Sequence, residues 1–220
     1  MIAQLKDKVL DFLFPPFCVA CGQAGEWWCE VCRQGVQVFN DSICPRCLSL
    51  KAHECGGGLP FDHVWSLGYY HDPKLRAAIT ALKFNGTSAL LNDLKIFIKS
   101  RLPKDLPHDA ILVPMPLSDK RHKERGFNQA ELIASLFGLP VVKNCLIRKL
   151  HCDPQSSVAH DLAARQINVK NCFVVQGLVP KHVILVDDVI TTGATAAEAA
   201  KVILASGAES VSVLTLAIGA

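Results

Sequence analysis

The fold is decided by a stretch that reads Val183-Ile184-Leu185-Val186-Asp187-Asp188-Val189-Ile190-Thr191-Thr192-Gly193-Ala194-Thr195. It opens with apolar residues, most of them β-branched, which predict a buried strand. Two adjacent carboxylates follow, then a turn rich in hydroxyls, and then an alanine-rich run at 196–201 that predicts a helix. In this strand–loop–helix unit the acids stand at the carboxyl end of the strand, where open parallel sheets bind their ligands.

The residues after the predicted strand are suited to a sugar phosphate. Paired carboxylates accept hydrogen bonds from the two hydroxyls of a vicinal diol such as that of ribose. The loop at 191–195 offers backbone N–H groups, hydroxyls and a helix N-terminus to a phosphate, and Gly193 permits close approach. Two other interpretations stay open for the acids. One is a Walker B magnesium site, although the sequence holds no G-x-x-x-x-G-K-[ST] loop, and the other is a helix cap without a ligand.

Length and composition set limits on the class of protein. The chain has 220 residues, half of them hydrophobic, which is enough for one medium domain and a small one. A net charge of +3 does not by itself indicate nucleic-acid binding. No apolar run is long enough for a transmembrane helix. The first 14 residues are interrupted by charges and predict a short amphipathic helix, packed on the protein or on a membrane surface, not a signal peptide. We expect a cytoplasmic location.

Cysteines are concentrated near the N-terminus, where seven of the ten lie between positions 18 and 55. Without a secretion signal, metal binding is a better explanation than disulfides. Cys18 and Cys21 form one C-x-x-C pair, and Cys29 and Cys32 form a second. Two such pairs joined by a short hairpin supply four thiolates to one ion, so they predict a structural zinc site. Reduced thiols without a metal are the alternative.

The next cysteines form a less complete pattern. Cys44 and Cys47 are a third C-x-x-C pair, but Cys55 stands alone and Gly58 occupies the place where a second cysteine is expected. His53 is a candidate for the missing fourth ligand of a second zinc. The alternative, that this half has lost its metal, stays open.

Strands and helices alternate through the rest of the chain. Strands are predicted at 64–70, 110–114, 172–175 and 211–218, and helices at 74–82, 89–101, 130–137 and 196–205. This order implies a mostly parallel sheet flanked by helices. A glycine run at 56–58 marks a linker, so we expect a small region at 1–60 and an α/β domain at 61–220.

A basic loop is predicted at 119–129, after the strand at 110–114. It carries Lys120, Arg121, Lys123 and Arg125. A pyrophosphate site, a nucleic-acid patch and an exposed charged loop are all compatible with this composition. The sugar-phosphate interpretation of 183–195 favours pyrophosphate. Lys83, at the end of the helix at 74–82, could likewise meet a phosphate or simply face solvent.

Two resemblances support these interpretations. The string at 183–195 resembles the signature of the type I phosphoribosyltransferases, which bind 5-phosphoribosyl-1-pyrophosphate (PRPP). Together with P-M-P-L at 114–117, R-G-F-N-Q at 125–129 and the N-terminal cysteine pairs, it is similar to the ComF/GntX family of phosphoribosyltransferase-like proteins over nearly the whole chain. Gly58 departs from the family pattern and leaves the second metal in doubt.

The resemblance implies a type I phosphoribosyltransferase-like fold and assigns roles to individual residues. Residues 148–168 match a mobile flap in which Arg148, Gln155, Arg165 and Asn168 fit the family pattern, while Cys152 replaces a threonine. Catalytic roles are implied for Asp187, Asp188, Arg125, Arg148 and Arg165. PRPP contacts are implied for Pro116, Leu117, Arg121, Asp187, Asp188, Val189, Ile190, Thr191, Thr192, Gly193, Ala194 and Thr195.

The implied function is transfer of a phosphoribosyl group with release of pyrophosphate, with Mg²⁺ held mainly by PRPP. The family is tied to natural transformation and the use of external DNA, but no residue identifies an acceptor. The alternative is a non-catalytic module that senses PRPP, or whose ribbons dock single-stranded DNA or proteins of the competence machinery. The ribbons carry few cations (Arg33, Arg46, Lys51), so the argument for DNA is the weaker one.

Overall fold

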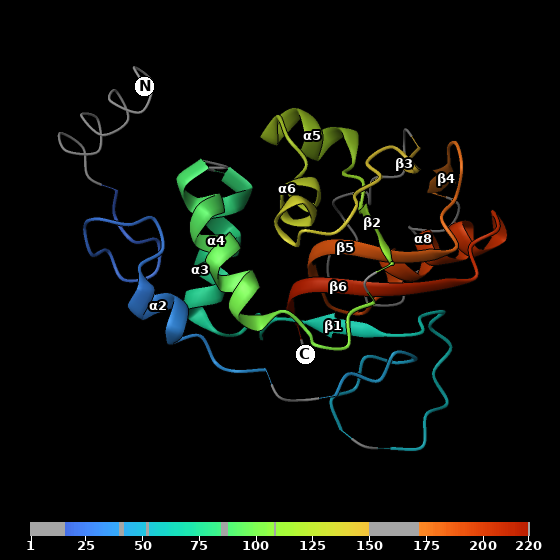
Figure 1. The fold of residues 1–220 in the computed structure, drawn as a ribbon, viewed down its shortest axis with the longest axis horizontal. Helices are drawn as coiled ribbons and strands as arrows, with labels where there is room; N and C mark the ends of the chain where they lie inside the picture. The colour runs from blue at the N-terminus through green and yellow to red at the C-terminus, as the bar shows by residue number, and fades with distance from the viewer. Residues whose placement is uncertain are drawn as a thin grey trace, which may run out of the picture.

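The computed structural model describes residues 16–39, 42–51, 53–84, 88–107, 109–149 and 172–219 (Figure 1). The amphipathic helix predicted within 1–14 and most of the predicted flap lie outside these residues. The elements in chain order are α2 (Glu30–Gln34), β1 (Val64–Ser66), α3 (Pro73–Phe84), α4 (Ser88–Arg101), β2 (Ile111–Pro114), α5 (Asp119–Arg125), α6 (Gln129–Leu136), β3 (Leu146–Arg148), β4 (Phe173–Val175), β5 (His182–Ile190), α8 (Ala194–Ala205) and β6 (Ser210–Ile218).

A four-stranded parallel sheet with the order β1-β6-β5-β2 forms the centre of the molecule. This confirms the predicted parallel sheet flanked by helices. Strand β4, predicted from its apolar residues, does not join this sheet but pairs antiparallel with β3. The sequence analysis missed β3, because three residues of which the middle one is exposed give no periodic signal.

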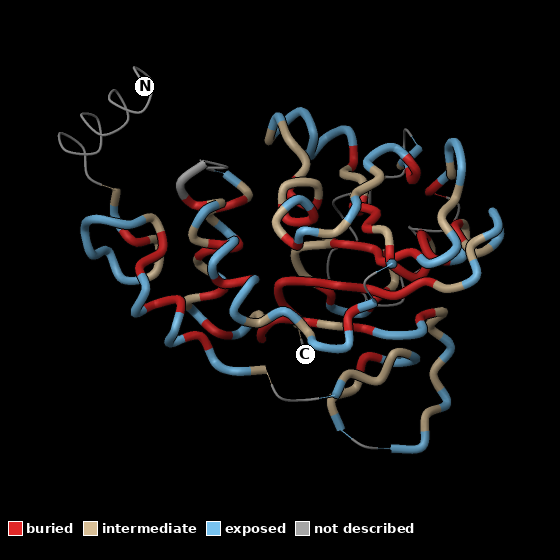
Figure 2. Tube along the Cα trace, in the orientation of Figure 1, coloured by how far each residue is buried: buried red, intermediate tan, exposed pale blue. Residues whose placement is uncertain are grey.

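The two faces of the sheet belong to two apolar clusters. Ile184, Val186 and Leu214 pack with α3, α4 and α6, whereas Val183, Leu185 and Val213 pack with α8. Alternate residues of β5 therefore point to opposite faces, as the pleat of a strand requires. Strands β5 and β6 are buried along most of their length (Figure 2). Among the described helices, none is long and apolar enough to cross a bilayer.

The first cysteine region, which contains Cys18, Cys21, Cys29 and Cys32, packs on the core beside α3 and α4. Trp28 is fully buried and its ring lies 4.9 Å from that of Phe97 in α4. The backbone N–H of Trp28 donates to Asp93 Oδ2 at 2.9 Å, and Arg33 forms an ion pair with Asp93 Oδ1 at 2.8 Å. This region is therefore integrated into the α/β domain through apolar packing and a largely buried ion pair.

The second cysteine region, which contains Cys44, Cys47 and Cys55, lies under the sheet near β1 in the view of Figure 1. Its Leu48 and the neighbouring Phe61 are buried in the cluster that contains α8. Asp62 anchors the chain as it enters β1, because its N–H donates to Val211 O and its carboxylate accepts from Val211 N. The two cysteine regions thus pack on opposite apolar clusters of one sheet.

Two local predictions are corrected by the structure. The segment predicted as a basic loop is largely the helix α5, because Ser118 caps its N-terminus and Gly126, with φ 76°, ends it in the left-handed conformation. Basic side chains in its last turn also favour the helix. In addition, Asp187 and Asp188 lie within β5, which continues to Ile190, and do not follow its end.

Candidate functional site

Asp187 and Asp188 occupy adjacent positions near the carboxyl end of β5. Asp187 pairs in register with Thr215 of β6, and both acids are partly buried. The N–H of Asp188 donates to Asp187 Oδ1 at 2.8 Å. Asp188 Oδ2 forms an ion pair with Lys83 Nζ, also at 2.8 Å. The structure therefore brings two carboxylates and one ammonium group together at this edge of the sheet.

The protonation of Asp187 is set by its surroundings. Burial away from water and the negative charge of the neighbouring Asp188 together raise the pKa of Asp187 to about 8. The N–H of Asp188 and the charge of Lys83 act in the opposite direction. Asp187 therefore retains its proton at neutral pH in the protein without ligand, and a cationic or hydroxyl-donating ligand would favour its carboxylate form.

Lys83 is the residue whose role the sequence left open. It stands at the end of α3, more than one hundred positions before Asp188, and its side chain is mostly buried. No sequence spacing connects the two, so only the fold reveals the pair. The geometry makes Lys83 the counter-ion of the acids.

We expect Lys83→Met to destabilise the protein by about 1–2 kcal/mol, because it leaves two neighbouring carboxyls without their counter-ion. Combining it with Asp188→Asn should recover part of that loss. Denaturant unfolding of both single variants and the double variant measures the coupling between the two side chains. Lys95→Met, on an exposed face of α4, is the control. Additive effects of Lys83→Met and Asp188→Asn would show that the ion pair contributes nothing.

The loop after β5 leads directly into α8. Gly193, with φ 70°, occupies the N-cap position of α8 and has no side chain to cap it. The helix begins with the bond from Ala197 N–H to Gly193 O, at 2.8 Å. Ala194 N–H makes only a long bond of 3.4 Å, to Thr192 Oγ1. Because the first N–H groups of a helix have no partner within it, those of α8 are available to donate to an anion.

The end of β2 lies beside the acids. Pro114 pairs with Val186, and Met115 N–H donates to Val186 O at 2.9 Å, so the following Pro116 and Leu117 run next to Asp187 and Asp188. Asn128 holds this turn, because its Nδ2 donates to Met115 O at 3.0 Å. Its Oδ1 accepts from Ala130 N–H and caps α6. The asparagine of R-G-F-N-Q therefore positions the P-M-P-L turn.

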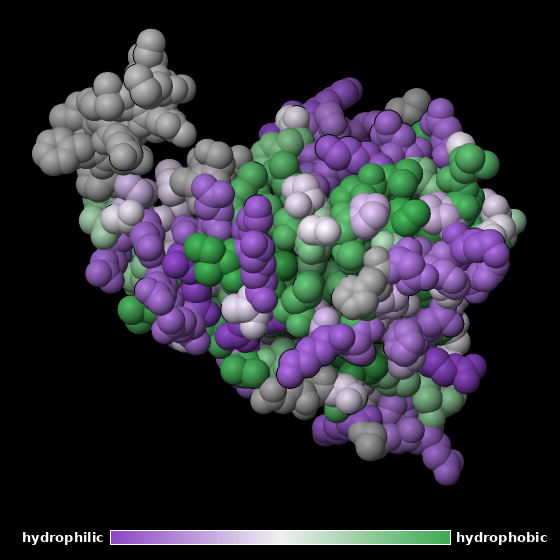
Figure 3. All heavy atoms as spheres, viewed as in Figure 1, coloured by the Kyte–Doolittle hydropathy of each residue, from purple (hydrophilic) through white to green (hydrophobic). Residues whose placement is uncertain are grey.

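The structure describes only some of the arginines to which the family resemblance gives a role at the pyrophosphate. Arg121 is exposed and Arg125 is half-buried on α5, which forms a hydrophilic rim at the top of the view in Figure 3. Arg148 ends β3, with its guanidinium 5.8 Å from the centre of the Phe173 ring. Arg165 lies outside the described residues. The structure thus places α5 directly after the P-M-P-L turn but gives no joint arrangement of all four arginines.

The first four cysteines form a compact cluster. The sulfurs of Cys18, Cys21, Cys29 and Cys32 all lie within 4.8 Å of one another. Cys21 and Cys29 Sγ are 3.7 Å apart, close to the ~3.8 Å edge expected for tetrahedral zinc with Zn–S bonds of ~2.3 Å. Burial opposes the thiolate of Cys18, but N–H groups of Cys29, Ala20 and Cys21 lower its pKa to about 6. The donor set fits a closed structural zinc site.

The second cluster includes the histidine. Cys44, Cys47, Cys55 and His53 place their donor atoms within 4.8 Å of one another. His53 Nε2 lies 3.1 Å from Cys47 Sγ, while Nδ1 lies 2.7 Å from Lys51 O. A Nδ1–H bond to a carbonyl fixes the tautomer that leaves Nε2 free for a metal. His53 therefore fits the position for which the sequence has no cysteine.

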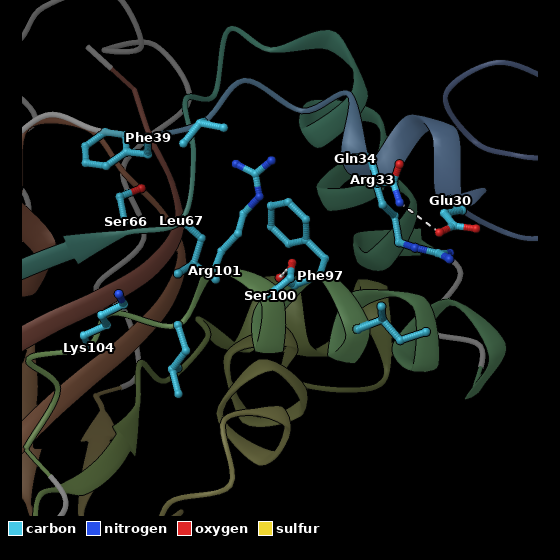
Figure 4. A pocket seen from close by; sticks show the side chains of 13 residues that line it. Glu30, Arg33, Gln34, Phe39, Ser66, Leu67, Phe97, Ser100, Arg101 and Lys104 are labelled. Atoms are coloured by element: carbon cyan, nitrogen blue, oxygen red, sulfur yellow. Dashed lines mark hydrogen bonds between the residues drawn. The ribbon is translucent and has the colours of Figure 1, made fainter.

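A groove of about 670 Å³ lies between α2, α4 and β1 (Figure 4). None of the predicted site residues lines it. Its arginines are engaged in structural bonds, since Arg33 pairs with Asp93 and Arg101 donates to Val36 O and Gln37 O at 2.6 and 3.0 Å. These bonds join the first cysteine region to α4, so we assign the groove to that junction and not to the site on β5.

Comparisons with known proteins agree with this geometry. Residues 9–56 match the model of a double zinc ribbon domain, which together with the two clusters supports structural zinc. The chain is 31% identical to the DNA utilization protein YhgH of Escherichia coli, over 92% of this chain and 96% of that protein. It is also 31% identical to the competence protein ComFC of Bacillus subtilis, with 86% and 82% covered, and to competence protein F of Haemophilus influenzae, with 86% and 89% covered.

Proposed function

Since the chain belongs to the ComF/GntX family of competence and DNA utilization proteins, we propose that it binds PRPP and transfers its phosphoribosyl group, in a process of DNA uptake or use of external DNA. The names of the relatives support the link to DNA. The ligand and the reaction are supported by the site on β5.

One observation carries the proposal: two carboxylates near the end of β5 are followed, after a short loop, by a helix N-terminus without a side-chain cap. Asp187 and Asp188 can accept hydrogen bonds from the ribose 2′- and 3′-hydroxyls. The N–H groups at 193–195 and the hydroxyls of Thr191, Thr192 and Thr195 can hold the 5′-phosphate. The acids and the loop would thus hold the diol and the phosphate of the same sugar.

The residues of the chain suggest how transfer would proceed. The bond between ribose C1 and the pyrophosphate oxygen breaks, and the acceptor forms a new bond to C1. Positive charge develops on the ribose in between, and the carboxylates of Asp187 and Asp188 would stabilise it. Arg121 and Arg125 on α5, with Arg148 and Arg165, would stabilise the leaving pyrophosphate. Mg²⁺, bound mainly by PRPP, would neutralise pyrophosphate oxygens.

A PRPP module without turnover is the competing function. It is favoured by one feature of the site: the ammonium of Lys83, which lies beside the acids, is held in an ion pair with Asp188 and is therefore not free to take a proton from an acceptor. Docking of single-stranded DNA on the ribbons receives less support, because Arg33 is committed to Asp93.

A screen for pyrophosphate release separates these functions. The protein is incubated with PRPP and Mg²⁺ and, in turn, with nucleobases, amines and single-stranded DNA. We expect PRPP to raise the melting temperature of the protein. We also expect one class of acceptor to cause release of pyrophosphate, in an amount equal to the amount of acceptor that gains a phosphoribosyl group. Stabilisation without release under any acceptor would favour the module. Absence of stabilisation at millimolar PRPP would contradict both.

A further inference from the structure

The loop at 191–195, which we propose binds the phosphate and call the phosphate loop, is covered by side chains within and just after the second cysteine region. A Cβ placed on Gly193 would lie 3.0 Å from Leu48 Cδ1, 3.2 Å from Leu59 Cδ1 and 3.5 Å from the Phe61 ring. Gly193 itself is buried, although the neighbouring Thr191 and Thr192 are exposed. The turn at the start of α8 is therefore held from one side by an apolar lid that comes from residues more than 130 positions earlier in the chain.

Backbone bonds fasten this lid to the turn that carries two metal ligands. Leu48 directly follows Cys47, and its N–H donates to Cys44 O at 2.8 Å. Leu59 N–H donates to Arg46 O at 3.0 Å. Gly57 approaches the same turn so closely that a Cβ there would lie 2.3 Å from Arg46 O. The positions of Leu48 and Leu59 are thus fixed by the Cys44–Cys47 turn.

Leu48 also needs external support to keep its conformation. Its φ is 64°, in the left-handed region that a branched apolar residue rarely adopts. Such a conformation persists only where the surrounding structure determines it. Here the supports are its own contacts in the core and the turn that Cys44, Cys47, Cys55 and His53 would hold around a metal.

We propose that a metal bound at the second cluster holds the phosphate loop in place. It would fix the positions of Leu48 and Leu59, which in turn pack on Gly193. The proposal rests on the proposed function in so far as the loop binds the phosphate of PRPP. Metal binding orders the Cys44–Cys47 turn, the turn seats the two leucines, and the leucines hold Gly193 in the conformation that presents the N–H groups of α8. Because such coupling is reciprocal, an anion on the loop also tightens metal binding at this cluster.

The first cluster has no comparable path to the loop. Cys18, Cys29 and Cys32 belong to the apolar cluster with α3 and α4, on the other face of the sheet. The coupling is therefore specific to the second metal, which gives the two ions different roles: the first stabilises the fold, and the second also tunes the ligand site.

Hydrogen–deuterium exchange without PRPP tests this effect of the second cluster independently of the proposed function. The zinc-loaded full chain is compared with Leu48→Ala/Leu59→Ala and with Cys44→Ser/Cys47→Ser. We expect the peptide covering 191–197 to lose about tenfold in protection in both variants. Peptides of β2 and β5 serve as internal controls for global stability. Leu50→Ala is the matched control, because Leu50 packs on the same apolar cluster but is not one of the three side chains that close on Gly193.

Calorimetry with PRPP and Mg²⁺ completes the test. We expect the dissociation constant to rise about tenfold in Leu48→Ala/Leu59→Ala and to stay unchanged in Leu50→Ala. Equal protection of 191–197 in all variants would overturn the inference, whether or not PRPP binds. A loss of protection in the two variants, with no PRPP binding to the wild type, would support the effect of the second cluster on the loop and contradict the proposed function.

Discussion

Asp187→Asn is expected to make the ligand-free protein more stable at pH 8 while it weakens PRPP binding about a hundredfold. Burial and the charge of Asp188 raise the pKa of Asp187 to about 8, so the folded state binds its proton more tightly than the unfolded chain does. Stability should therefore be greatest at low pH, with respect to this group, and fall as the pH rises from about 4 to about 8. Asparagine carries no such cost, so the variant should gain about 1–3 kcal/mol at pH 8, or several degrees in melting temperature.

The same substitution should weaken PRPP binding about a hundredfold, because a neutral amide replaces the carboxylate that hydrogen bonds from the ribose hydroxyls would favour. Melting curves at pH 5 and pH 8, each with and without PRPP and Mg²⁺, give both effects in one series. Asp109→Asn is the control, since Asp109 is exposed and precedes β2. Equal stability of Asp187→Asn and the wild type at pH 8 would show that the burial of this carboxyl carries no cost.

Cys29→Ser is expected to unfold the first ribbon and expose Trp28. Four thiolates around one zinc hold residues 18–32, and the folding of such regions draws its free energy from the metal. Trp28 is fully buried against Phe97, and its backbone N–H donates to Asp93. Loss of the ion should release this contact, with a red shift of tryptophan fluorescence and a loss of about 3–5 kcal/mol in the stability of the domain.

Cys47→Ser is the matched substitution in the second cluster, which lies on the other face of the sheet and far from Trp28 in the packing of the core. It should remove one zinc ion of two and leave the fluorescence of Trp28 unchanged. Zinc content and emission spectra of the two variants decide the matter. A Cys29→Ser protein that keeps both ions and a shielded Trp28 would contradict the structural role of the first cluster.

The sequence predicted the features that depend on local patterns. The apolar run at 183–186, the alanine-rich helix and the alternating strands indicated a parallel sheet, and that sheet is present. The C-x-x-C spacings indicated the two clusters, because two ligands on one tight turn need no distant partner to be recognised. His53 was a candidate only by its nearness to Cys55, and the fold turns its Nε2 toward Cys47.

What the sequence could not supply depends on contacts between distant segments. The pairing of Lys83 with Asp188 and the contact of Leu48 with Gly193 both join residues separated by more than one hundred positions. The helix α5 was mistaken for a loop because its side chains are almost all polar and exposed, so no apolar period marks it. Its cap at Ser118 and its end at Gly126 were the available signals.

Isothermal titration of the zinc-loaded full chain with PRPP and Mg²⁺ at pH 8 tests the central claim most directly. We predict saturable binding at one site per chain, unchanged in Asp109→Asn and about a hundredfold weaker in Asp187→Asn. Two results would contradict the assignment of residues 183–195 as a PRPP site. One is the absence of saturable heat up to ~1 mM PRPP, which would mean that the binding free energy is weaker than about 4 kcal/mol. The other is equal PRPP binding by Asp187→Asn and the wild type.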